Sequence, residues 1–240
     1  MTKLDKFIEQ LKNIFGSRLK SVFVYGAKAG EKADNLLQDV DLMVLVTDLH
    51  GEDIKKCSKP AREWMGKSCI FCSKRNALPV FMGEKEWYNS SDVYAMEYSD
   101  IKENHKILYG EDLICNINVN RDDLRLQCEA ETKNLLMQFR AHYLMNAHSH
   151  IMLQKSLVPL TKTLNAIFKA ILRIKNIEVS KSPYENLNKI HSLFAINKSF
   201  YEKLLCHKEK HCTLNKKETI DTADTAVAEL QKLLDYVNNL

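Results

Sequence analysis

The sequence has 240 residues, of which 45% are hydrophobic and 28% are charged, and its formal net charge is +4. This is the composition of an ordinary soluble globular protein, and so small a charge does not by itself indicate a nucleic-acid binder. No apolar stretch approaches the roughly 20 residues that a membrane-spanning helix needs. The 7 cysteines are odd in number and no signal peptide is recognisable, so we expect free thiols and a cytoplasmic location.

The first half of the chain mixes helical and extended patterns. Residues 3–15 carry one apolar stripe at helical spacing and end before Gly16, which predicts a helix. Apolar runs at 21–25 and after Asp39-Val40-Asp41 are bounded by turn-forming residues and predict buried strands. Further along we expect a helix at 52–65, in which Pro60 must lie near the start or force a break. Extended segments are expected at 77–82 and 93–99, and a short apolar run at 106–109 precedes Gly110.

After about Val119 only helical periodicity remains. The helical stretches contain no glycine and lie at 121–152, 157–175, 184–194, 199–210 and 222–237. The sequence therefore predicts an α/β domain over residues 1–118 and an all-α domain over residues 119–240.

Two carboxylates open the second predicted strand. Because side chains alternate along a strand, Asp39 and Asp41 point to the same face, roughly 6–7 Å apart. Two neighbouring carboxylates on an otherwise apolar strand are costly without a positive partner, and Mg²⁺ is a suitable one. An aspartate at a strand start can equally occupy a turn.

This segment resembles the nucleotidyltransferase superfamily that includes DNA polymerase β and the aminoglycoside nucleotidyltransferases. The signature of that superfamily is a strand ending in Gly-Ser, a short helix, and a strand with Asp-x-Asp. Gly26 and the later Asp39-Val40-Asp41 match, whereas Ala27 stands in place of the serine. The segment LPVFMGEKEWYNSSDVYAMEYSDIKENHKILYG and the helical half resemble a bacterial two-domain group. The resemblance implies an α/β (α+β) nucleotidyltransferase-like domain with a small mixed sheet, followed by an all-α helical bundle.

The resemblance also implies roles for individual carboxylates. Asp39 and Asp41 would hold Mg²⁺ or Mn²⁺, and a third carboxylate on a neighbouring strand would complete the catalytic site. We assign the third position to Glu97, the only acid inside the predicted extended run, because Asp92 and Asp100 lie at its ends.

A nucleotide would bind at the glycine turn. Gly26 has no Cβ, so a triphosphate can approach the backbone, and the N–H groups of Ala27 and Lys28 can face phosphate oxygens. The side chain of Lys28 adds a positive charge nearby. The same residues can also be explained as a simple turn followed by a solvated lysine.

The expected function is transfer of a nucleoside monophosphate from a nucleoside triphosphate to a hydroxyl group. The acceptor would be a small molecule or a protein side chain, with the helical half supplying its pocket, and long nucleic acid is not the expected substrate. A catalytically inactive binding or regulatory module is the alternative; Ala27 favours it, and the presence of both Asp39 and Asp41 opposes it. A helical adaptor with an α/β cap is a third interpretation.

Overall fold

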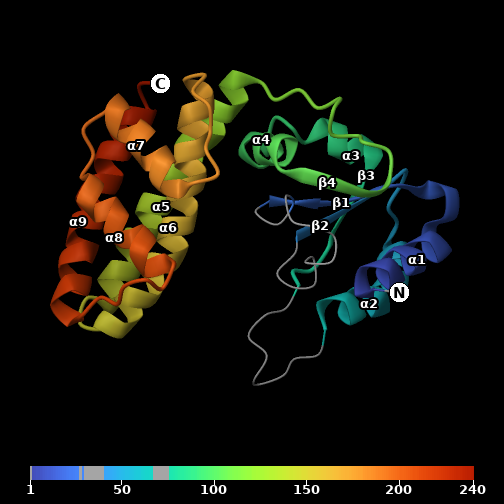
Figure 1. The fold of residues 1–240 in the computed structure, drawn as a ribbon, viewed down its shortest axis with the longest axis horizontal. Coiled ribbons are helices and arrows are strands. Elements are labelled where there is room, and N and C mark those ends of the chain that lie inside the picture. Colours follow the sequence, from blue (N-terminus) through green and yellow to red (C-terminus); the bar gives the residue numbers. More distant parts are fainter. Residues whose placement is uncertain (1, 27–28, 30–40, 67–75) are drawn as a thin grey trace. The chain divides into compact units, whose positions relative to one another are not determined.

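The computed structural model describes residues 2–26, 29, 41–66 and 76–240. The chain divides into two compact units, Met1–Val119 and Asn120–Leu240. The first contains a sheet with helices on both faces, and the second contains helices (Figure 1).

The strands described in the first unit form one mixed sheet. They are β1 (Leu19–Tyr25), β2 (Asp41–Val46), β3 (Val80–Gly83) and β4 (His105–Gly110), in the order β3-β2-β1-β4. β1 pairs antiparallel with both β2 and β4, and β2 pairs parallel with β3. The prediction of a small mixed sheet is confirmed, and its central strands are the two apolar runs around the glycine turn.

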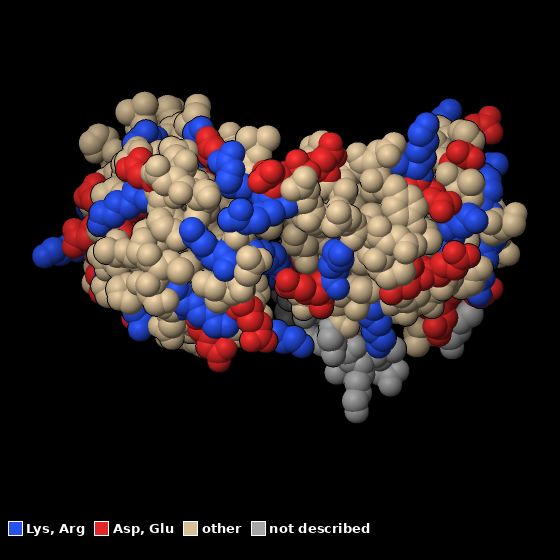
Figure 2. Space-filling model, turned by 90° about the horizontal axis from the view of Figure 1, so that it is seen from above, with Lys and Arg blue, Asp and Glu red and all other residues tan. Residues whose placement is uncertain are grey.

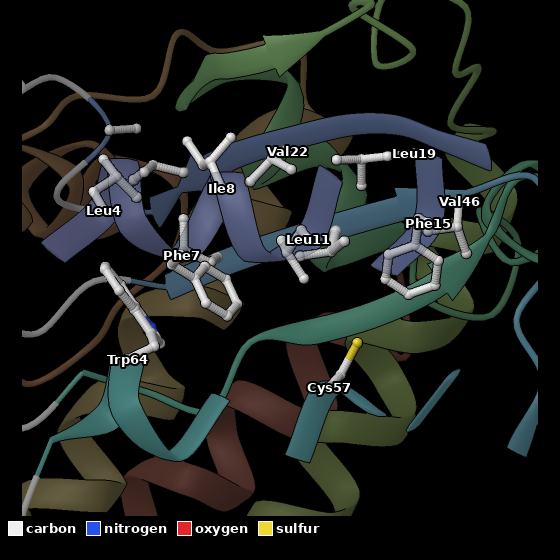
Figure 3. Close-up of a cluster of buried hydrophobic side chains, with 14 residues drawn as sticks. Leu4, Phe7, Ile8, Leu11, Phe15, Leu19, Val22, Val46, Cys57 and Trp64 are labelled. Carbon is white, nitrogen blue, oxygen red and sulfur yellow. The ribbon is translucent and has the colours of Figure 1, made fainter. Parts of the chain in front are cut away.

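The two central strands bury side chains on both faces, so the sheet separates two hydrophobic cores. One core joins Val22, Val24 and the even-numbered side chains of β2 to helices α1 (Lys3–Phe15) and α2 (Gly51–Met65). Phe7, Leu11 and Trp64 are fully buried there (Figure 3), each contributing roughly 1.5–3 kcal/mol by burial.

The second core lies on the other face of the sheet. Phe23, Met43 and Leu45 pack there against Trp87 of α3 (Glu84–Asn89) and against Tyr98 of α4 (Ala95–Glu103). Figure 1 shows α1 and α2 on one side of the sheet and α3 and α4 on the other. The alternation of side chains along β1 and β2 thus decides which residues meet which pair of helices.

An ion pair ties the start of β1 to the start of α2. Arg18 donates two parallel hydrogen bonds to the buried Asp53 carboxylate, from Nη1 at 2.9 Å and from Nη2 at 2.8 Å. The His50 backbone N–H donates to the same carboxylate at 3.1 Å, so Asp53 also caps the helix. The guanidinium beside it holds the pKa of Asp53 well below its usual range.

Two expectations for this unit were wrong. Residues 93–99 are not extended: a turn leads into α4, where Ala95, Tyr98 and Ser99 are buried at helical spacing. Tertiary burial of this short stripe outweighs the strand-like composition. Pro60 neither begins nor ends α2, which continues through it with the proline ring buried.

The described helices of the second unit are α5 (Arg121–Asn146), α6 (His150–Ile174), α7 (Pro183–Leu193), α8 (Lys198–Lys208) and α9 (Lys216–Val237). The central helix is α6, which packs against each of the other four. The predicted helix over 121–152 is instead interrupted, because Ser149 caps a new helix through a hydrogen bond from the Met152 N–H. Within the described residues, no helix has both the length and the apolar character for crossing a membrane.

Replacing Asp53 with asparagine should lower the free energy of unfolding at neutral pH by about 1–3 kcal/mol, the usual contribution of hydrogen bonds to charged groups. Because the folded pKa of Asp53 is depressed, its stabilisation is present above about pH 4 and is lost as the pH falls. Chemical denaturation between pH 3 and 7 should therefore show a shallower acid dependence for Asp53→Asn. Glu52→Gln, an exposed neighbour in the same helical turn, is the control. Equal acid profiles for Asp53→Asn and wild type would contradict this account.

Candidate functional site

Three strands bring polar side chains together at one end of the sheet. Tyr25, the last residue of β1, pairs with Asp41 on one side and with His105 on the other. Laterally paired residues point to the same face. Asp41 alternates with Leu42 and so shares the face of Met43, which is the face covered by α3 and α4.

The glycine turn lies directly beside the Asp41 carboxylate. Gly26 has φ +77°, and its N–H donates to the Asn104 carbonyl at 3.0 Å while its carbonyl accepts from the Ala29 N–H at 3.1 Å. A Cβ added at Gly26 would lie 3.6 Å from Asp41 Oδ2. These contacts place the Gly26 backbone, which has no side chain, next to the Asp41 carboxylate at the exposed end of β2.

The surroundings of Asp41 are partly buried and polar. Burial, and then the negative charge of Asp41, raise the pKa of the Tyr25 phenol, so this hydroxyl stays protonated at neutral pH. His105 Nδ1 donates to the Ile101 carbonyl at 2.8 Å, and its Nε2 lies 3.5 Å from Asp112 Oδ2. The His105 ring is therefore held in one orientation beside the same row of residues.

Tyr25, His105 and Asp112 were not among the residues that sequence reasoning selected. The sequence signal for Tyr25 was present, because it immediately precedes the glycine turn. His105 and Asp112 could be found only by knowing that β4 pairs with β1, since nearly 80 residues separate those strands in the sequence.

The predicted site residues differ in whether the structure describes them and in where it places them. Gly26 and Asp41 lie together, whereas Asp39, Ala27 and Lys28 fall outside the described residues. Glu97 was predicted on a strand, and that placement was wrong: it has an exposed side chain on α4. Its helix packs through Tyr98 and Ile101 on the sheet face that carries Asp41, so its role as third ligand stays a prediction.

The donor chemistry at Asp41 suits a hard divalent cation. Its carboxylate is solvent-accessible at the strand start, and oxygen ligands are those that Mg²⁺ prefers. Across the described parts of the chain, no group of three or more His, Cys, Asp or Glu side chains is positioned to hold a metal ion. Asp39, the other predicted ligand, lies outside the described residues.

Comparison with known proteins bears on the fold. No protein-family model matches the sequence, and no curated protein matches it significantly. Among solved structures, the crystal structure of spectinomycin adenyltransferase AAD(9) from Enterococcus faecialis with ATP and spectinomycin is similar over 95% of this chain and 98% of that chain. Its TM-score is 0.61 and the sequence identity is 13%. The similarity confirms the predicted fold, a nucleotidyltransferase-like domain followed by a helical domain.

Replacing Gly26 with alanine should destabilise the protein by about 1–2 kcal/mol, the cost of a left-handed conformation for a residue with a Cβ. The added methyl has room, because its nearest neighbour, Asp41 Oδ2, is at an ordinary contact distance. Gly51→Ala is the matched control, because Gly51 does not have a positive φ and has open space around it. The free energy of unfolding of this variant should be unchanged or higher. Equal unfolding free energies for both variants would show that the Gly26 turn is not strained.

Proposed function

We propose that this protein is a metal-dependent nucleotidyltransferase that moves a nucleoside monophosphate from a nucleoside triphosphate to a hydroxyl of a small molecule or protein. The observation that carries the proposal is the Asp41 carboxylate beside the Gly26 backbone, at the end of a sheet with the nucleotidyltransferase-like fold. That combination puts a cation ligand next to a segment that phosphates can approach closely.

Individual residues would have the following roles in this reaction. Asp41, with Asp39, would hold Mg²⁺ or Mn²⁺, and the glycine turn at Gly26, with Ala27 and Lys28, would receive the phosphates. Glu97 would complete the ligand set or accept the proton of the acceptor hydroxyl. When bound, divalent cations would neutralise charge on the triphosphate and on the leaving pyrophosphate.

The described neighbours of Asp41 support a role in positioning. Tyr25 retains its proton and can donate a hydrogen bond at the edge of the site. The His105 ring, held by the Ile101 carbonyl, lies in the same row of paired residues. A similar fold in a protein whose structure contains ATP and spectinomycin supports a small-molecule acceptor for this chain as well.

A catalytically inactive nucleotide-binding module is the second candidate, and the alanine at position 27 favours it. The hydroxyl of the serine in the superfamily signature is missing there, which removes one phosphate contact. Release of pyrophosphate from each nucleoside triphosphate, measured with a panel of hydroxyl-bearing acceptors and Mg²⁺, separates the two. Asp41-dependent release indicates an enzyme, whereas metal-dependent binding without turnover indicates the inactive module.

Substituting Asp41 with asparagine should abolish metal-dependent nucleotide binding while leaving the fold intact. In thermal denaturation with Mg²⁺, a nucleotide at a hundredfold excess over its dissociation constant should stabilise the wild type by about 2.7 kcal/mol. This gain should disappear in Asp41→Asn.

Asp48→Asn is the matched control, because it removes the same charge from an exposed residue beyond the opposite end of β2. This variant should retain the full stabilisation by nucleotide and Mg²⁺. An undiminished gain in Asp41→Asn would remove Asp41 from the site, and equal losses in the two variants would mean that only overall charge matters.

A further inference from the structure

A second candidate binding surface lies between α1 and α2. The two helices form a groove of about 840 Å³, here called the α1–α2 groove, whose charged lining residues are Lys3, Lys6, Lys55, Lys59, Arg62 and Glu63. Its cations come from two facing stripes at helical spacing, Lys3 and Lys6 on α1 and Lys55, Lys59 and Arg62 on α2.

Among the described lining residues, the cations of this groove outnumber the acids. Of the lining residues that the structure describes, Glu63 alone is acidic, and it accepts hydrogen bonds from Lys6 at 2.9 Å and from Gln10 at 3.2 Å. Within the described residues, Lys55, Lys59 and Arg62 form no ion pair. The following sequence, residues 67–75, reads KSCIFCSKR and contains no acid that could compensate for them.

The floor of the groove is apolar and closed. Phe7 and Trp64 line it, yet each is only 1% exposed, so neither ring is available for stacking on a ligand. Lys3 Nζ lies 5.7 Å from the centre of the Trp64 ring, and its partial burial lowers the pKa of Lys3. An anion in the groove would favour the charged form of Lys3, and recognition would come from the cations alone.

We propose that the α1–α2 groove binds a compact polyphosphate, a ligand with two or three linked phosphate groups. Lys55 and Arg62 are seven positions apart on α2, or about 10 Å along the helix axis, and the cations of α1 lie opposite. This length matches about three phosphates, whereas proteins that bind nucleic acid tightly typically neutralise six to ten. On the face that Figure 2 shows, Lys and Arg are interspersed with Asp and Glu.

The described lining of the groove includes neither Gly26 nor Asp41. It lies on the α1–α2 side of the sheet, and the side chain of Asp41 belongs to the opposite face. We therefore expect polyphosphate to bind in the groove without Asp41 and without a divalent cation. A test of this binding does not depend on whether the protein transfers nucleotides.

Titration with inorganic tripolyphosphate tests the proposal. The full-length protein is titrated calorimetrically in EDTA at constant ionic strength, with sulfate as the reference anion. We expect tripolyphosphate to bind at least tenfold more tightly than sulfate, and the double variant Lys59→Gln/Arg62→Gln to weaken that binding at least tenfold. Lys56→Gln is the matched control, since Lys56 is exposed on the same helix but does not line the groove. Lys56→Gln and Asp41→Asn should both bind tripolyphosphate as the wild type does.

Four results would overturn the proposal. Equal affinity for sulfate and tripolyphosphate, or an equal loss in Lys56→Gln, would show general attraction to surface charge. Loss of binding in Asp41→Asn would show that tripolyphosphate occupies the other site. Tight binding of a 20-nucleotide single-stranded RNA without binding of tripolyphosphate would make the groove a nucleic-acid contact instead. Thermal denaturation of each variant without ligand shows whether it is folded.

Discussion

The pairing register of β1 with β2 is the constraint on which the rest of the first unit depends. It sets Tyr25 opposite Asp41 and lets the apolar residues of both strands alternate between two cores. A slip of one residue would move Met43 and Leu45 into the core of α1 and α2 and would carry Asp41 to the wrong face. Burial of the apolar residues therefore also positions the polar end of the sheet.

The same separation of faces explains how one small unit can hold two chemically different surfaces. On one face the strand ends expose Asp41 beside a backbone turn without a side chain, which suits a cation and phosphates. Behind the other face, α1 and α2 bury Phe7 and Trp64 and direct their lysines outward. The Arg18–Asp53 pair holds the start of α2 against β1 and so keeps this helix in register with the sheet.

Sequence patterns sufficed where local periodicity and tertiary burial agree. The α1 stripe, the two central strands and the helical character of the second unit are all examples. Gly26 and Asp41 were identified because one follows and the other begins a strongly apolar strand. The turn before α4 and the helix itself could not be predicted. Residues 93–99 are short, rich in residues that favour strands, and become helical only through contacts with a distant part of the sheet.

The same limit applies to the candidate site. The approach of His105 to Tyr25 depends on which strand pairs with β1, and a single sequence contains no signal for pairing between strands so far apart. The choice of Glu97 rested on a strand that is a helix in the structure, so its proposed role now depends on the face that α4 covers. The basic groove needs the packing of α1 on α2, which places two separate lysine stripes side by side.

The most direct test of the central claim is a crystal structure with Mn²⁺ and a non-hydrolysable nucleoside triphosphate analogue, with the manganese located by its anomalous scattering. We predict a manganese peak about 2.1 Å from an Asp41 carboxylate oxygen, with the triphosphate against the Gly26 turn. A nucleotide bound with its metal elsewhere, for example in the α1–α2 groove, or no metal at Asp41 with the nucleotide in place, would contradict it.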